Sequence, residues 1–217
     1  MVLGAAQGVF LETAVTIESE SPSAEGRVYL CKGFDALRAS GLGGTAELAI
    51  WERPAGAAIR TAFESVDFSG FEDIRIDGSA DAILSGLEAC LSAQPWPGLV
   101  KDYVAEDVIA MIGPMRAIEA DYTLRLEYVT DDACRKFHKD ETDFRLITSY
   151  LGRGTQWSFD SGDGQGEIQE MDTFHVGMLL GQRCAFPSRV LHRSPPIEGT
   201  GEVRFVMVLD VERAGYC

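Results

Sequence analysis

The sequence predicts an α+β protein in which a mainly helical N-terminal half leans on a β-rich C-terminal half. Up to about residue 120, apolar residues recur at helical spacings of three and four. From about Asp121 onward, short runs rich in β-branched and aromatic residues are separated by Gly, Pro and Asp turns, without helical segments between them. Strands spaced in this way are typical of a sandwich or a barrel rather than of a parallel α/β sheet.

The first element is a leader. Residues 18–26 (ESESPSAEG) are polar, acidic and interrupted by proline, so they predict a partly flexible segment, preceded by a weakly alternating edge strand at residues 9–17. The expected organisation is therefore a leader at 1–27 and a single domain at 28–217, with a mainly helical part at 28–120 and a β core at 121–212.

In the helical part, residues 46–51 (AELAIW) predict a short strand that ends before Pro54. Three segments carry the helical period: residues 57–63, 80–91 and 100–115. Five segments of the C-terminal half are strand-like: residues 122–129, 144–151, 176–180, 189–191 and 202–211. The acidic, Gly-rich insert at 158–172 does not have the spacing of an EF-hand, and it predicts a mobile loop that serves as a lid.

Composition excludes several classes of protein. The 217 residues are 46% hydrophobic and carry 34 acidic against 19 basic side chains, a net charge of −15. This acidity argues against nucleic-acid and anionic-membrane partners and favours a neutral or cationic small-molecule substrate. Five widely spaced cysteines without a C-x-x-C pair, no basic signal-peptide start and no long apolar run predict a cytoplasmic protein with reduced thiols. No P-loop, dinucleotide fingerprint or nucleophilic serine elbow is present in the sequence.

The candidate chemistry lies with the histidines of the β-rich half. In an extended segment, His138 and Asp140 project to the same face because they are two residues apart. His192 follows at the end of a later strand, and two imidazoles with one carboxylate form the set that holds non-haem Fe(II) with open positions. Arg204, twelve residues later, is placed to pair with a distal carboxylate of a cosubstrate.

This pattern of H-x-D, a distal histidine and a strand arginine resembles the signature of Fe(II)/2-oxoglutarate-dependent oxygenases on the double-stranded β-helix, or cupin-like, fold. The resemblance implies Fe(II) at His138, Asp140 and His192, and 2-oxoglutarate at Arg204. The segment RLITSYLG is similar to the strand after H-x-D in the prolyl-hydroxylase branch, which makes Tyr150 a second candidate for the cosubstrate carboxylate, although a core position is slightly favoured for it.

A narrower resemblance leaves an alternative open. The segments AIWERP, CRKFHKD, TSYLGRGTQW and LHRSPP resemble an uncharacterised bacterial family whose members often lie near zinc-homeostasis genes. This implies a cupin-like metal-binding protein without turnover, in which Cys134 or His175 closes the zinc shell. A third hypothesis is a β-domain whose histidines bind nothing. Arg193 is a further candidate for binding an anion, and Trp157 for a pocket wall.

Overall fold

The computed structural model describes residues 28–33, 46–116, 120–132, 134–162 and 166–213. The leader at 1–27, with its expected edge strand, lies outside these residues. Within the part described, no helix is long and apolar enough to cross a membrane.

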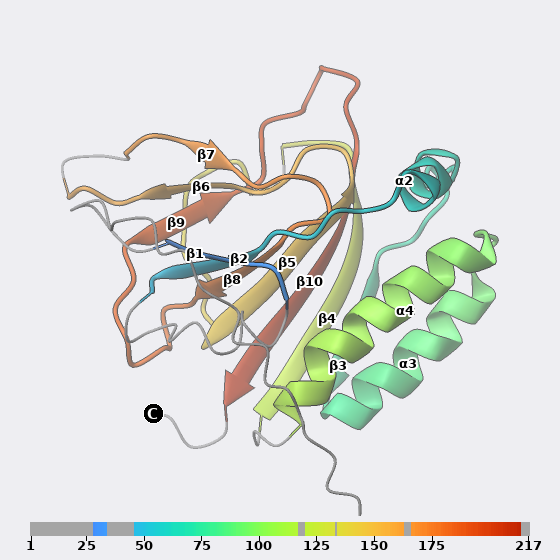
Figure 1. Ribbon diagram of the computed structural model, residues 1–217, viewed down its shortest axis with the longest axis horizontal. Helices are drawn as coiled ribbons and strands as arrows, with labels where there is room; N and C mark the ends of the chain where they lie inside the picture. The colour runs from blue at the N-terminus through green and yellow to red at the C-terminus, as the bar shows by residue number, and fades with distance from the viewer. Residues whose placement is uncertain (1–27, 34–45, 117–119, 133, 163–165, 214–217) are drawn as a thin grey trace, which may run out of the picture.

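The architecture consists of two β-sheets and a layer of helices (Figure 1). The larger sheet has seven strands in the order β1-β2-β8-β5-β10-β4-β3, and its neighbours are antiparallel except for β1 and β2. These strands are β1 (Val28–Cys31), β2 (Leu48–Trp51), β3 (Ile74–Gly78), β4 (Ala120–Val129), β5 (Phe144–Leu151), β8 (Val176–Leu180) and β10 (Arg204–Arg213). The smaller sheet has the order β7-β6-β9, with β6 at Gln156–Phe159, β7 at Gln169–Glu170 and β9 at Val190–Arg193.

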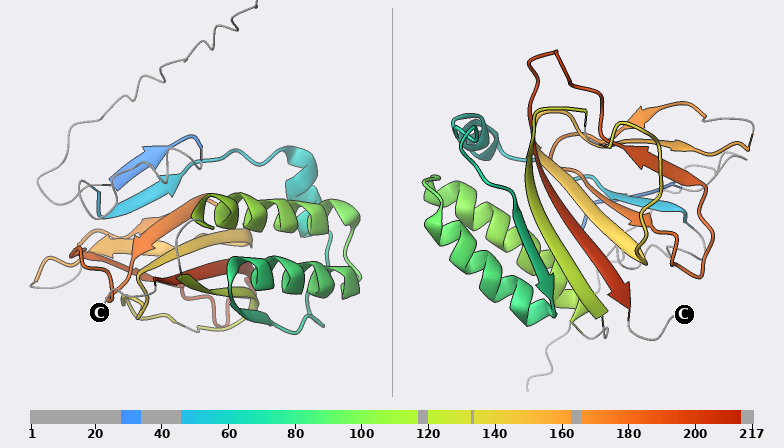
Figure 2. Two further views of the ribbon diagram at one scale, coloured as in Figure 1. Left: turned by 90° about the horizontal axis from the view of Figure 1, so that it is seen from below. Right: turned by 180° about the vertical axis from the view of Figure 1, so that it is seen from behind.

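The helices cover one face of the larger sheet (Figures 1 and 2). They are α2 (Ala57–Glu64), α3 (Ala80–Ala93) and α4 (Gly98–Ile112), which continues into the 3₁₀ turn η1 (Gly113–Met115). Helix α3 begins where the Ser79 side chain accepts a hydrogen bond from the backbone N–H of Ala82 at 3.3 Å, an N-cap. Its buried residues Ile83, Leu87 and Leu91 recur every four positions, so one stripe of the helix faces the sheet.

Alternation along the strands divides the interior into two cores. In β10, Phe205 and Met207 belong to the core under the helices, whereas Val206 and Val208 point into the space between the two sheets. The smaller sheet lies on the side of the larger sheet away from α3 and α4 (Figures 1 and 2). The inter-sheet core consists of Leu48, Ile50, Ile147, Met171, Leu179, Val190, Val206 and Val208.

The expected α+β class is confirmed, and the two-sheet arrangement is consistent with a jelly-roll, cupin-like fold. All three expected helices and the strands expected from residue 46 onward are present within a few residues of their expected bounds. Strands β1 and β3 were not expected, because they fall in the part interpreted as mainly helical. The insert at 158–172 differs from a simple lid loop, since its described flanks belong to β6 and β7, which pair with each other.

Candidate metal centre

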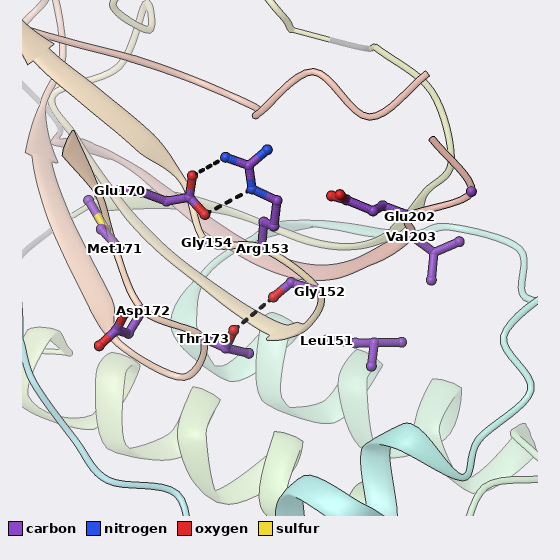
Figure 3. A pocket seen from close by; sticks show the side chains of 11 residues that line it. Leu151, Gly152, Arg153, Gly154, Glu170, Met171, Asp172, Thr173, Glu202 and Val203 are labelled. Atoms are coloured by element: carbon purple, nitrogen blue, oxygen red, sulfur yellow. Dashed lines mark hydrogen bonds and ion pairs between the residues drawn. The ribbon is translucent and has the colours of Figure 1, made fainter. Parts of the chain in front are cut away.

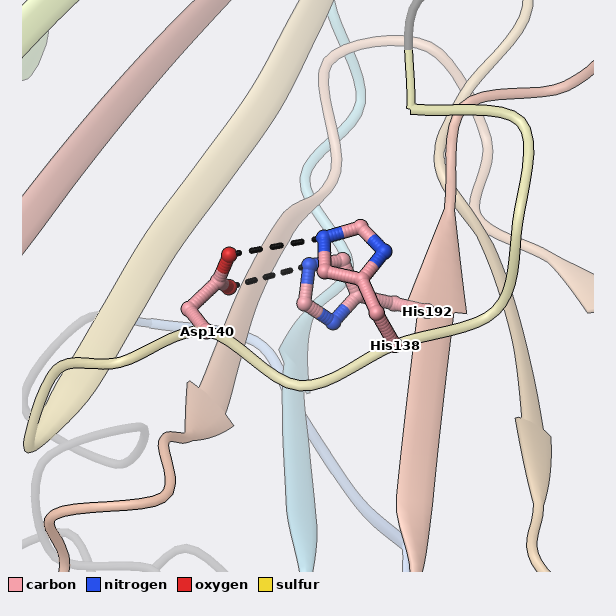
Figure 4. A group of neighbouring side chains, drawn as sticks. All are labelled: His138, Asp140 and His192. Carbon is pink, nitrogen blue, oxygen red and sulfur yellow. Dashed lines mark ion pairs between the residues drawn. The ribbon is translucent and has the colours of Figure 1, made fainter.

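Three metal-ligating side chains converge at one end of the space between the sheets. One ligand atom from each of His138, Asp140 and His192 lies within 4.8 Å of the other two (Figure 4). In the part of the chain that the structure describes, this is the one such group, and neither Cys134 nor His175 belongs to it. The sequence predicts these three residues together.

Backbone pairing brings the two histidines together across 54 residues. The backbone N–H of each histidine donates to the C=O of the other at 3.0 Å. This isolated antiparallel bridge joins His192 of β9 to the segment that contains His138. The imidazole centroids consequently lie 4.6 Å apart. Because residues two apart in an extended chain share a face, the Asp140 carboxylate reaches both rings.

The ring nitrogens suit metal binding. The Nδ1 of His138 lies 2.8 Å from the carbonyl of Lys136, which fixes the proton of the neutral ring on Nδ1 and leaves the lone pair of Nε2 directed at the group. The Nε2 of His192 is buried and lies 3.0 Å from Oδ2 of Asp140, but without hydrogen-bond geometry. A buried ring nitrogen without a hydrogen bond, facing a carboxylate oxygen, is a donor arrangement that a metal ion completes.

The electrostatics of the group favour the metal-binding forms of Asp140 and His192 but the protonated form of His138. Burial acts to raise the pKa of Asp140, but contacts with His138 and His192 and the charge of Arg145 outweigh it and hold this pKa well below its usual range. Burial lowers the pKa of His192 and keeps its ring neutral. The more exposed His138 has a raised pKa because of its contact with the Asp140 carboxylate. Metal binding must therefore displace a proton chiefly from His138.

A second feature of the inter-sheet space is a cation whose charge has no partner. Arg204 at the start of β10 is 1% exposed. It donates from Nε to the carbonyl of Arg153 at 2.7 Å, and its other bonds go to three hydroxyl groups. These are Ser194 from Nη1 at 2.9 Å, and Ser149 and Thr155 from Nη2 at 3.0 and 3.5 Å. Burial without a carboxylate in contact lowers the pKa of Arg204 to about 10, so it stays protonated at neutral pH.

Comparison with the other largely buried arginines shows what is unusual about Arg204. Arg53 pairs through both terminal nitrogens with Asp107. Arg145 contacts two carboxylates. Among the described residues, Arg204 forms no ion pair. A buried charge without a carboxylate in contact is costly; Glu170 acts on Arg204 only from a distance and is itself paired with Arg153, so an anionic ligand would improve the balance.

The chain holds Arg204 close to the metal centre. Its partner Ser194 is two residues from His192, so their Cα atoms are about 7 Å apart along an extended chain. Ser194 precedes Pro195, which disfavours a helical turn at this point. The carbonyl of Arg153 that accepts from Arg204 lies in a sharp turn. In this turn Gly152 has φ +74°, and a Cβ on Gly152 would lie 2.0 Å from a backbone oxygen.

Beside this turn lies an open hollow of about 520 Å³, lined by residues 151–154, 170–173 and 201–203 (Figure 3). The ion pair of Arg153 with Glu170 crosses it, with Nη2 and Oε2 2.5 Å apart. The three residues of the metal centre do not line the hollow. Arg204 does not line it either, but the carbonyl of Arg153, a lining residue, accepts the Nε hydrogen bond of Arg204.

Comparison with known proteins assigns a family. A model of the family described as a protein of unknown function (DUF1826) matches residues 42–210, which is most of the chain. This chain belongs to the DUF1826 family. No curated protein matches the sequence.

Solved structures resemble the DUF1826 fold at low identity. The dioxygenase for auxin oxidation from rice is 12% identical with a TM-score of 0.50, over 85% of this chain and 82% of that protein, which shows a shared fold. Dioxygenase for auxin oxidation 1 from Arabidopsis thaliana, as a 2-oxoglutarate complex, is 11% identical with a TM-score of 0.47; the match covers 65% of this chain and spans 62% of that protein. A full-length Neurospora crassa protein in complex with alpha-KG is 12% identical with a TM-score of 0.45, over 86% of this chain and 84% of that protein.

Tyr150 is the expectation that the DUF1826 structure corrects. It faces the helices, the opposite side of β5 from Arg204, and its hydroxyl donates to Oδ2 of Asp107 at 2.8 Å. Its ring stacks on Phe63 with centroids 5.1 Å apart. The neighbouring Ser149 is the residue of this strand that contacts Arg204. Tyr150 is therefore a core residue on the face of β5 that points away from Arg204.

The remaining candidates, Trp157 and Arg193, lie on opposite faces of the smaller sheet. Trp157 is the direct cross-strand neighbour of His192 and packs on the inter-sheet core, so it stands beside the metal centre. Arg193 alternates to the other face, where it lies over the ring of Phe137 and donates to Gln156 at 2.8 Å. Sequence reasoning missed the hydroxyl groups around Arg204, because isolated Ser and Thr carry no periodic signal.

Proposed function

We propose that this DUF1826 protein is a non-haem Fe(II)/2-oxoglutarate-dependent dioxygenase that oxidises a small-molecule substrate, with its two sheets forming a double-stranded β-helix. One observation carries the proposal: the buried guanidinium without a counter-ion, Arg204, is tethered next to an open group of two histidines and one aspartate. A ligand that fits this site must bind the metal at one end and place a carboxylate against Arg204 at the other. 2-Oxoglutarate carries groups for both contacts.

The roles of the residues follow from their donor atoms. His138, Asp140 and His192 would hold Fe(II), which supplies the redox chemistry that activates dioxygen when it is bound. With three protein ligands the site keeps positions open, whereas a closed structural zinc site needs a fourth. Arg204 would bind the distal carboxylate of 2-oxoglutarate through the remaining N–H of Nη1, and a second contact would replace one of its hydroxyl partners.

The walls of the site favour an apolar environment. The inter-sheet core is aliphatic, and Trp157 next to His192 adds an aromatic surface. Such walls exclude water and strengthen the interactions of the few charged groups among them. Together with the acidity of the chain, they favour a neutral or cationic substrate with an apolar surface.

The decisive experiment measures 2-oxoglutarate binding and succinate release by the Fe(II)-loaded protein. Arg204→Met should weaken 2-oxoglutarate binding by at least about 30-fold, since truncating one partner of a buried charged pair costs about 2–5 kcal/mol. The matched control is Arg193→Met, which removes an arginine from the outer face beside His192 and should leave binding within about twofold. One equivalent of tightly held zinc with no 2-oxoglutarate binding would refute the proposal and identify a metal-binding protein without turnover.

A further inference from the structure

A line of alternating charges runs from β4, the strand next to the edge of the larger sheet, to the metal centre. It crosses three adjacent strands, β4, β10 and β5, before it reaches the segment that carries the aspartate ligand. In order, its members are Glu127, Arg125, Asp210, Arg145 and Asp140. Side-chain exposure falls along the line, from 28% at Glu127 to 12% at Asp140.

Arg145 is the link that touches the proposed ligand. Its Nη1 lies 2.5 Å from Oδ1 of Asp140. Its other two nitrogens form a bidentate pair with Asp210, with Nε to Oδ1 at 2.6 Å and Nη2 to Oδ2 at 2.8 Å. Arg145 and Asp210 are direct cross-strand partners on β5 and β10, so the sheet itself fixes this pair.

The contact divides the two oxygens of the ligand. Oδ1 of Asp140 is held by Arg145 and also lies 3.5 Å from Nε2 of His138, while Oδ2 faces the buried Nε2 of His192 at 3.0 Å and has no arginine in contact. A carboxylate held in this way presents one oxygen to a metal ion. Without that contact it is free to rotate and bind through both oxygens, which would fill a position that the chemistry needs open.

We propose that Arg145, held in turn by Asp210, is a positioning residue that keeps Asp140 a one-oxygen ligand. The inference rests on the metal site of the proposed function, but not on 2-oxoglutarate. Asp210 is needed because a guanidinium and a metal dication share one carboxylate and repel each other. The bidentate pair with Asp210 balances the charge of Arg145 and anchors it in place.

The test is Co(II) binding to the full chain, measured by calorimetry and by the visible spectrum of the bound ion, which reports coordination geometry. Arg145→Met should weaken Co(II) binding by about 10- to 100-fold, the usual effect of losing an outer-sphere partner, and should change the spectrum. Asp210→Asn should act in the same direction but less strongly. Arg145→Lys should recover part of the affinity, since an ammonium reaches one carboxylate but cannot bridge two.

The matched control is Arg125→Met, which removes the same charge from the same line on the far side of Asp210, two steps farther from the metal. Both Met variants make the protein more negative, and long-range attraction alone predicts tighter cation binding in both. Weaker binding in Arg145→Met alone therefore isolates positioning. Unchanged or tighter binding with an unaltered spectrum in Arg145→Met would overturn the inference; if that variant does not fold, Arg145→Lys and Asp210→Asn decide by the same criteria.

The outcomes separate this inference from the proposed function. If wild-type protein binds Co(II) and the variants behave as expected but 2-oxoglutarate does not bind, the dioxygenase proposal fails and the positioning role stands. If Asp140→Ala binds Co(II) as wild type does, the metal site itself is wrong, and the positioning role fails with it.

Discussion

Removal of the Tyr150 hydroxyl distinguishes a structural tyrosine from a cosubstrate ligand. The hydroxyl is fully buried and donates to Oδ2 of Asp107, which also accepts from Nη2 of Arg53 at 2.6 Å. In Tyr150→Phe the ring can keep its stacking on Phe63, and Asp107 keeps its ion pair. The substitution therefore removes one hydrogen bond to a charged acceptor and little else.

The expected loss follows from the charge on the acceptor. A hydrogen bond to a charged group contributes about 1.5–3 kcal/mol, whereas one between neutral groups contributes about 0.5–1.5 kcal/mol. In a chain of this length, 1 kcal/mol shifts the melting temperature by about 2–4 °C, so Tyr150→Phe should lower it by about 3–12 °C. Tyr122→Phe is the matched control, because Tyr122 is also buried on the helix side of the sheet and donates to a neutral carbonyl, that of Met115, at 3.0 Å.

The assays are urea unfolding and calorimetric titration with 2-oxoglutarate. Tyr150→Phe should lose more stability than Tyr122→Phe with an unchanged m-value, and both should bind 2-oxoglutarate as wild type does. Equal losses in the two variants would refute the charged-acceptor argument. Weakened 2-oxoglutarate binding in Tyr150→Phe at unchanged stability would show that the tyrosine serves the site after all.

Three further predictions use the same preparations. Gly152→Ala should destabilise the protein and weaken 2-oxoglutarate binding together, because its Cβ would meet a backbone oxygen at 2.0 Å; normal melting and binding would contradict this. The contact with Asp140 raises the pKa of His138, so protons compete with Co(II) for this ring at a higher pH than for an ordinary imidazole. Co(II) affinity, measured between about pH 5 and 8, should therefore begin to fall at that higher pH as the solution is acidified. A pH-independent affinity would count against His138 as a ligand. Arg53→Met should cost about 3–5 kcal/mol in urea unfolding by leaving the charge of Asp107 buried without its ion pair, and an unchanged free energy of unfolding would argue against the pair.

The strands that sequence reasoning missed are those with the weakest periodic signal. In β3, Ile74 and Ile76 alternate with Arg75 and Asp77, but a pattern of two inward residues at a sheet edge is too short to stand out. Strand β1 pairs in parallel with β2, and its place depends on a contact between segments twenty residues apart that local pattern does not encode.

Some residues of the site can be predicted from local sequence pattern, whereas others depend on contacts between segments far apart in the chain. His138 and Asp140 were predictable because a two-residue period is local. The face of Tyr150 was not, since residues 146–150 of β5 are all buried and a strand covered on both sides shows no alternation. The pairing of Arg145 with Asp210 depends on strand register across 65 residues, which charge pattern alone does not supply.

A net charge of −15 opposes the approach of the proposed dianionic cosubstrate. This repulsion is weakened because it falls off with distance from the surface charges. At physiological ionic strength, exposed charges are screened beyond about 8 Å, whereas an interaction in the buried interior is screened much less. Arg204 is 1% exposed and contacts no carboxylate among the described residues, so the cost of its desolvation is already met on folding, and a carboxylate that reaches it gains the full interaction. On the proposed function, the acidic surface would discriminate by size: a small dianion between the sheets would be attracted by Arg204 and by a bound metal ion, while a polyanion confined to the surface would be repelled.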